Sequence, residues 1–523
     1  NVAIGAARAN NEIQSDVTAR ILNVADLSGS GSVQLSATRS ADIFARTFAA
    51  AVGAQVSGQG SGFGVTGGGA TALNTIGGST IAELSNSVVG KGTGTDPKAG
   101  SLDVTATDTA TIAALTGALA LTVSGAVEGK ATGVAVGASV ANNVIGSGAA
   151  VRATVSGTPV RATGAVNVSA RSNQTVKAIT VATAVGGSAA RNLIDIATTA
   201  EVLGAVAIQA GSLSVQADNS STIASLVGAA SIAATFGSTD AVSVALAASI
   251  ALNRIAGNVS ASVTDATVTT LSGGVSIAAT RTGTISTVAA AASVAVGAGG
   301  DKGVGVSGAG VAAVNQIDSS TTASAGTATI DAQGAVAVSA SSTATITADI
   351  VSAALSVGGG SASAGAGALG VSIAYNEIGR WTAFDEANNR LSESPALSGR
   401  AKVSATLTNT TVKATGALSV RAASGNTVTT NIAAIAVGVT ASGDKAGAVT
   451  IGGTFAMSSI GLATEATIDG DRTGSGPGLD AASAVVSAQD SSTITTRALS
   501  ASLALAAAGS TAGLVTLGLA TTD

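Results

Sequence analysis

The residues best suited to binding chemistry gather in one stretch of the chain that does not repeat. Trp381 is the only tryptophan, and Tyr375, the only tyrosine, stands shortly before it. Arg380 and Phe384 complete a group of aromatic and cationic side chains that could stack on a sugar or contact a partner. We therefore predict a glycan or partner contact at Tyr375, Arg380, Trp381 and Phe384. The alternative is a short helix or loop that covers a sheet face.

Catalysis has little support in the residue types present. The chain contains no histidine and no cysteine, which excludes a Ser-His-Asp triad, a cysteine nucleophile and a Cys/His zinc site. Asp385 and Glu386 are adjacent, so their side chains should diverge, whereas a glycosidase needs two carboxylates across a cleft. We therefore expect a protein that is not an enzyme and that holds no cofactor.

Calcium is the one metal that the aspartates leave open. Asp195, Asp240, Asp301 and Asp444 stand at or near expected turns, where carboxylates could bind this ion. However, the Gly-Gly-x-Gly-x-Asp nonapeptide of calcium-binding β-rolls does not occur in series. Turn formation accounts for these aspartates more simply, because Asp stabilises turns through its own backbone.

The elements that would position these residues repeat about every 62 residues. An apolar run that ends in Asn-x-Ile occurs seven times, and an eighth copy has Ser458 and Ile460 in the same places. Successive anchors are 63, 69, 49, 61, 62, 61 and 82 residues apart. We expect the repeated asparagine to be structural, either as an amide ladder between stacked units or as a cap on each turn. The anchor residues are Asn11, Asn74, Asn143, Asn192, Asn253, Asn315 and Asn376.

The irregular spacings predict loops within one continuous array that covers residues 1–523. The 82-residue spacing contains an insertion loop at 381–400, and the 69-residue spacing contains a Gly/Thr-rich insert at 91–98. The 49-residue spacing is short because the segment before Asn192 is trimmed. The chain opens and closes at the same place in the unit, which indicates a window from a longer array. The units start near residues 2, 65, 133, 183, 241, 304, 367 and 449.

Composition excludes several classes of protein. Charged residues are 10% of the chain, against roughly 25% in a typical soluble protein, yet the chain is too apolar to be disordered. The net charge of −5 and the lack of basic runs give no support for a nucleic-acid partner. Long uncharged stretches such as 350–376 are diluted by Thr, Ser and Gly, so we predict no transmembrane segment.

The residues between anchors have the alternation of β-strands. Val336 and Val338 alternate with small residues, which is a period of two. The middle of each unit carries a recurring phrase of about 19 residues, as in Ala153–Ala170, Ala261–Ala279 and Ala405–Ala423. These phrases resemble the coils of parallel β-helices in large exported bacterial surface proteins, including filamentous-haemagglutinin-like adhesins. The resemblance implies an all-β, parallel β-helix-like solenoid of about eight units, in an extracellular or cell-surface setting in bacteria.

The end of each unit differs from its middle. Two long apolar strands flank a Gly-rich turn, for example around 300–303 and around 443–445, and we interpret each pair as a long hairpin. One face of these strands carries mostly Val and Ile and the other carries Ala, Gly and Ser, with no charge on either. Both faces should therefore be covered, by a tightly layered interior or by a neighbouring chain. Self-association with copies of the same protein is the expected partnership.

The number of coils in each unit sets the size of the array. Three coils of about 20 residues in each of eight units give about 24 rungs and a rod of about 115 Å. One large coil in each unit makes the same chain only about 40 Å long. We predict a three-coil or intermediate unit.

Three functions follow from these observations. The first is a structural extracellular protein that forms a rod or filament of a bacterial surface or biofilm matrix. The second is an adhesin stalk that binds glycans or host cell surfaces through inserted loops. Ice binding by threonine rows ranks last, because Thr-x-Thr, as at 105–107 and 345–347, does not stand at one fixed place in every unit.

Overall fold

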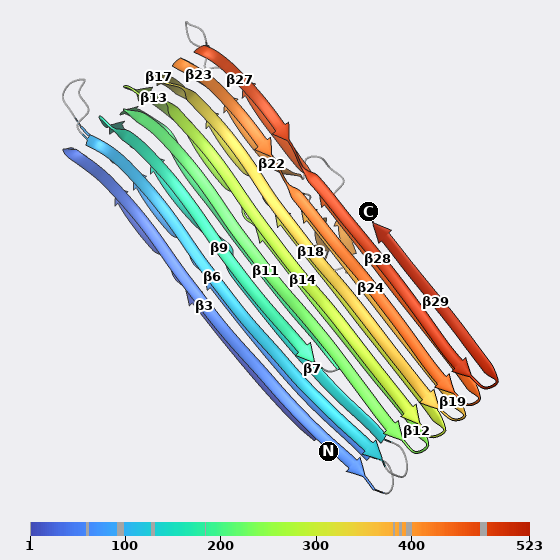
Figure 1. The fold of residues 1–523 in the computed structure, drawn as a ribbon. Coiled ribbons are helices and arrows are strands. Elements are labelled where there is room, and N and C mark those ends of the chain that lie inside the picture. The colour runs from blue at the N-terminus through green and yellow to red at the C-terminus, as the bar shows by residue number, and fades with distance from the viewer. Residues whose placement is uncertain are drawn as a thin grey trace.

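The protein is a stack of flattened β-coils in which each strand pairs with its counterpart in the next repeat. The computed structural model describes residues 2–58, 62–91, 99–126, 131–183, 185–379, 382–385, 390–393, 400–470 and 478–522. Twenty-seven strands form one sheet, and every pairing within it is parallel. Figure 1 shows the long strands side by side in the order of the sequence. The predicted all-β parallel solenoid is confirmed.

Each coil begins with the anchor strand that contains Asn-x-Ile. The chain then bends into a shorter return strand, turns a corner, and runs back along one long strand to a Gly-rich tip. The anchor strands are β1 (Val2–Gln14), β4 (Gly62–Gly77), the first part of β7 (Ala131–Ser156), the first part of β10 (Val185–Ala210), β12 (Asp240–Ala256), β15 (Lys302–Asp318), β19 (Ser363–Ile378), β25 (Lys445–Ile460) and β29 (Thr511–Thr522).

The return strands form the same sheet as the anchor strands, beyond the bend. They include the second parts of β7 and β10, which continue past the bend and pair with the return strands of neighbouring coils. The others are β2 (Val17–Leu22), β5 (Thr80–Ser85), β8 (Val160–Arg161), β13 (Val259–Thr270), β16 (Thr321–Gly326), β17 (Thr329–Ala332), β22 (Ala401–Thr408) and β26 (Leu462–Asp469).

The long strands lie opposite the anchor and return strands. In the seventh and eighth coils the long path is divided in two, and its first strand also turns the corner. The long strands are β3 (Gly29–Ser57), β6 (Ala99–Ala126), β9 (Ala165–Thr183), β11 (Ser212–Gly237), β14 (Val275–Gly299), β18 (Val336–Gly360), β23 (Thr411–Ser424) with β24 (Thr427–Ser442), and β27 (Leu479–Asp490) with β28 (Thr493–Ala508).

One repeat makes one large coil, so the prediction of three coils or an intermediate number is wrong. Asn253 pairs with Asn315, 62 residues further on, and all three strands of a coil pair at this same repeat distance. The recurring 19-residue phrase suggested a complete rung, but in residues 261–279 it crosses the corner from β13 to β14. Eight coils therefore stack over about 40 Å, while a 25-residue strand such as β14 extends for roughly 80 Å.

The Gly-rich turns reverse the chain, but they join strands of opposite layers. β14 pairs with β11 and β18, whereas β15 pairs with β12 and β19. The predicted hairpins are therefore arches, because the two strands that flank each turn bond to neighbouring coils and face each other through side chains. The trimmed repeat is a shortened arch at 183–185. Above it, β11 pairs directly with β6 at residues 235–236, so the neighbouring coils meet over the gap.

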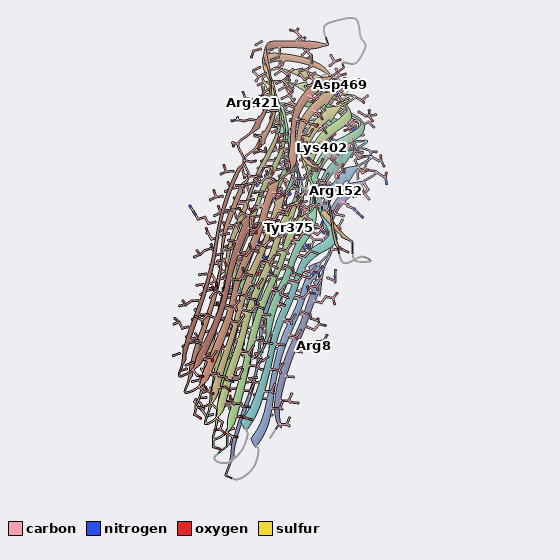
Figure 2. The ribbon with its side chains drawn as sticks, turned by 90° about the vertical axis from the view of Figure 1, so that its right-hand side faces the viewer. Arg8, Arg152, Tyr375, Lys402, Arg421 and Asp469 are labelled. Carbon is pink, nitrogen blue, oxygen red and sulfur yellow. The ribbon has the colours of Figure 1, made fainter. Side chains whose placement is uncertain are left out.

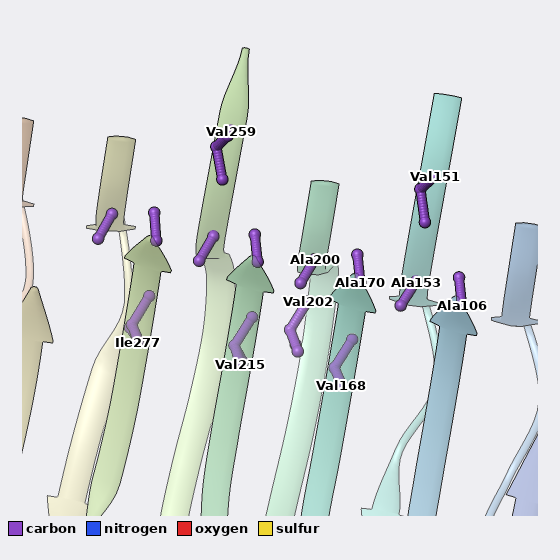
Figure 3. Packing of buried hydrophobic residues seen from close by; sticks show 14 of the residues in the cluster. Ala106, Val151, Ala153, Val168, Ala170, Ala200, Val202, Val215, Val259 and Ile277 are labelled. Carbon is purple, nitrogen blue, oxygen red and sulfur yellow. The ribbon is translucent and has the colours of Figure 1, made fainter. Parts of the chain in front are cut away.

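The core occupies the half of each coil between the corner and the Asn-x-Ile anchor, which we call the core half. Val, Ile, Leu and Ala point inward there from both layers and are almost completely buried. Figure 3 shows Val202 and Val259 of the return layer beside Val168, Val215 and Ile277 of the long strands. Outward positions in this half carry Ser, Thr and charged residues. This alternation is the usual pattern of a sheet with one buried face.

The half between the anchor asparagines and the Gly-rich turns, which we call the tip half, has the opposite polarity. Its inward side chains are Ala, Gly, Ser and Thr, and the layers approach so closely that a Cβ on Gly305 would lie 2.5 Å from the Val357 carbonyl oxygen. Ser249 and Ser356 donate hydrogen bonds across the layers to the carbonyls of Ala290 and Gly305, both at 2.5 Å. The larger Val, Ile, Leu and Phe side chains point outward and are exposed. The prediction that both faces are covered is correct only for the small-residue face of this chain.

Candidate interaction surfaces

The anchor asparagines lie in one buried row at the boundary between the two halves. Each Nδ2 donates to the Oδ1 of the asparagine in the next coil, at 2.7–2.8 Å, from Asn11 through to Asn376. Asn376 then donates to Thr430 Oγ1 at 2.7 Å, and Thr430 contacts Ser458 Oγ at 3.0 Å. The row is therefore an amide ladder. The isoleucine two residues later points inward too, because side chains at i and i+2 share a face.

Cutting this ladder in its middle should be costly. Replacing Asn253 by leucine removes the acceptor of Asn192 and the donor to Asn315, both buried. We expect the free energy of unfolding to fall by about 2–4 kcal/mol, because each unsatisfied buried polar group costs roughly 1–3 kcal/mol. Urea denaturation measures the change. Asn11→Leu is the matched control, since Asn11 is less buried and has one ladder bond; equal losses in the two variants would contradict the account.

A second buried polar row crosses the long strands at the level of the bend between anchor and return strands. Arg39 begins it, and Asp108 of the next coil accepts from Arg39 Nε at 2.9 Å and also from Nη2. Arg39 Nη1 donates to three carbonyl oxygens of the bend, those of Ser15, Gly77 and Gly78, at 3.1, 2.6 and 2.6 Å. The guanidinium therefore satisfies backbone groups that the bend leaves without ladder partners. The row comprises Arg39, Asp108, Ser172, Asn219, Arg281, Ser342, Ser424 and Asp490.

Arg281 occupies the same row without a carboxylate of its own. Its side chain is fully buried, and its Nε and Nη2 have no hydrogen-bond partner. Burial lowers the pKa of Arg281 to about 10, an effect that Asp318 partly opposes. Asp318 itself bonds Arg254 on the outer surface at 3.0 Å. The contrast with Arg39 gives one row two opposite energetic roles, which the Discussion develops.

The outer surface of the core half carries charges that pair from one coil to the next. Arg20 contacts Glu83 at 2.9 Å, and Arg171 contacts Asp218 at 3.5 Å. Burial raises the pKa of the Asp218 carboxyl, while Arg171 acts in the opposite direction. Such exposed pairs contribute little individually, but opposite charges on facing strands favour the observed register. Figure 2 shows Arg152, Lys402, Arg421 and Asp469 at this end of the slab.

Threonines form a regular outward row on the long strands, which corrects the expectation that they hold no fixed place. One position is threonine in seven consecutive coils, and Asp42 precedes the row in the first coil. The register could not be read from the sequence, because loop lengths change the number of residues between equivalent positions. The threonine row consists of Thr111, Thr175, Thr222, Thr284, Thr345, Thr427 and Thr493.

The predicted contact residues of the insertion are only partly described. Tyr375 points outward from β19 yet is buried, and its hydroxyl contacts Glu377 Oε2 at 3.2 Å. Arg380 and Trp381 lie outside the described residues. Phe384 belongs to β20 (Thr382–Asp385), which pairs with β21 (Arg390–Glu393) in an antiparallel ribbon separate from the main sheet; its side chain lies outside what is described.

The apolar outer faces of the tip half are the largest feature that sequence reasoning left unassigned. On the anchor strands they include Val244, Leu246 and Ile250, and on the long strands Ile232 and Phe236, all more than 40% exposed. A contiguous apolar surface of this kind usually marks an interaction site. The alternation of large and small residues was visible in the sequence, but not which set points outward.

Three further comparisons bear on the class of protein. Protein-family models, curated proteins and solved structures yield no match to this chain. Among the described residues there is no helix long and apolar enough to span a membrane. The same part of the chain has no group of three acidic side chains placed to hold a metal ion. The fold itself defines the class, a parallel β-solenoid with one coil in each repeat.

Proposed function

We propose that this chain is a structural repeat protein that forms a rod or filament of a bacterial surface or matrix. The observation that carries the proposal is that all coils present the same outer faces in register, so any contact made by one coil can be repeated by the others. Low charge and an Ala/Gly/Ser/Thr/Val composition are in keeping with a scaffold. The extracellular bacterial setting rests on the resemblance to exported surface proteins described above.

Electron microscopy of native material tests this function. Negative staining should reveal extended assemblies in which slabs about 80 Å wide, the length of a long strand, repeat. Discrete, monodisperse monomers in material taken directly from the source would contradict the proposal.

Ice binding is a second candidate function, favoured by the threonine row. Neighbouring threonines in the row stand one strand spacing apart, about 4.8 Å, and in coils 6–8 the residues two further on are Thr347, Thr429 and Thr495. Such an array of hydroxyl and methyl groups could hold ordered water in a fixed pattern. Thermal hysteresis of the purified protein tests this function, and Thr345→Lys should abolish any activity that is found. A protein that freezes without hysteresis would eliminate this candidate.

A further inference from the structure

The tip half directs its large apolar side chains away from its own interior. In β12, Ser243, Ala245 and Ala247 point inward and are buried, whereas Val244 and Leu246 point outward and are 44% and 47% exposed. The close approach of the two layers leaves no room for the larger side chains inside. An isolated chain therefore leaves its largest apolar groups in water, which costs roughly 25 cal/mol for each Å².

The outer face of the anchor strands, which we call the anchor face, is continuous and uncharged over its central part. From the row of Val244 to the row of Ile250, the outward residues of coils 2–8 are aliphatic residues, Gly, Thr and one Phe. The whole face covers about 36 Å along the strands and about 38 Å along the stack, or roughly 1,400 Å². A stable complex needs only about 800 Å² from each partner.

A ridge and a trough lie next to each other on this face. Leu246 of β12 pairs in register with Gly308 of β15, and Gly308 pairs with Leu369 of β19. Because Gly308 and Gly310 have no side chains, β15 forms the floor of a groove of about 450 Å³ between Leu246 and Leu369. The ridge and the groove are at the same height along the strands and one coil apart.

This arrangement is complementary to itself. A two-fold axis that runs along the strands between β12 and β15 would place Leu246 of each copy over Gly308 of the other. The rows of both copies would then coincide along the whole face, because each has the same spacing between coils. Such isologous packing is the commonest form of self-association. A fluid lipid surface has no ridges to match the groove.

We propose that the anchor face packs against the anchor face of a second copy of this chain, with Leu246 of each copy seated in the Gly308–Gly310 groove of the other. The inference rests on the proposed scaffold function and specifies its lateral contact. The two solenoids lie face to face with their strands parallel and their coil stacks running in opposite directions. Each copy thereby covers the apolar surface of the other.

Sedimentation velocity of the full chain tests the contact through one substitution on each face. Leu246→Arg places a charge at the centre of the interface and should weaken dimerisation roughly a hundredfold or more, because a buried unpaired charge costs several kcal/mol. Ile232→Arg is the matched control on the opposite face, where Ile232 is 71% exposed, and should leave the dimer intact. Both positions point outward, so unchanged circular dichroism should show that both variants fold.

Other outcomes separate this contact from the scaffold function. A wild-type chain that stays monomeric at high concentration, or a dimer that Leu246→Arg leaves unchanged, would overturn the contact, even where native material contains filaments. A monomer that floats with phosphatidylcholine vesicles and loses this binding in Leu246→Arg would assign the face to lipid and also overturn it. A dimer sensitive to Leu246→Arg, with no filaments in native material, would support the contact and contradict the scaffold function.

Discussion

Replacing Asp108 by alanine is expected to lower the free energy of unfolding by about 3–5 kcal/mol, the usual cost of removing one partner of a buried ion pair. Asp108 and Arg39 are both almost fully buried. The variant leaves the Arg39 guanidinium inside the solenoid with the bend carbonyls as its only described partners. Chemical denaturation at pH 7 measures the loss.

Two further variants identify the cause of that loss. Glu83→Ala removes the carboxylate of the Arg20 pair, which is partly exposed, and should change stability by no more than about 1 kcal/mol. The double variant Arg39→Met with Asp108→Ala should recover part of the loss, because the buried charge is then gone. A single Asp108→Ala variant as stable as Glu83→Ala would contradict the assigned role of the pair.

Replacing Arg281 by methionine should have the opposite effect and stabilise the protein. The pKa of this guanidinium falls from its ordinary 12.5 to about 10 through burial. A difference of this size corresponds to an unfavourable contribution of about 3 kcal/mol, since one pKa unit equals 1.36 kcal/mol. Methionine keeps much of the length of the side chain without the charge. We therefore expect a gain of up to about 3 kcal/mol at pH 7.

The pH dependence of this gain has a definite sign. Below pH 10 the guanidinium is protonated in both the folded and the unfolded chain, so the unfavourable contribution is complete and the gain is constant. Above pH 10 the folded state releases the proton first, the wild type becomes relatively more stable, and the gain shrinks. Denaturation of both proteins between pH 6 and pH 9 should therefore give parallel curves. A methionine variant less stable than the wild type would show that Arg281 is satisfied within the fold.

The sequence predicted the features that depend on local pattern. The 62-residue period, the strand alternation around Val336 and the trimmed repeat before Asn192 all correspond to structure. Each depends on residues close together in the chain, or on a motif as distinct as Asn-x-Ile. Pairing of equivalent strands between repeats follows from the period itself.

The features that escaped prediction depend on register over long distances. The buried row that contains Arg39, Asp108 and Arg281 has a different polar residue in almost every coil, so no motif marks it. The threonine row is hidden in the same way by loops of different length. Whether Val244 or Ala245 points inward depends on the opposite layer, and alternation alone leaves that choice open.

The number of coils in each repeat is the central structural claim, and one distance tests it directly. The chain has no cysteine, so nitroxide labels can be attached to Thr111→Cys and Thr427→Cys, two outward positions of the threonine row that lie five coils apart. Electron paramagnetic resonance should give a backbone separation of about 24 Å, one strand spacing for each repeat. A separation near 72 Å would mean three coils in each repeat and would contradict the account.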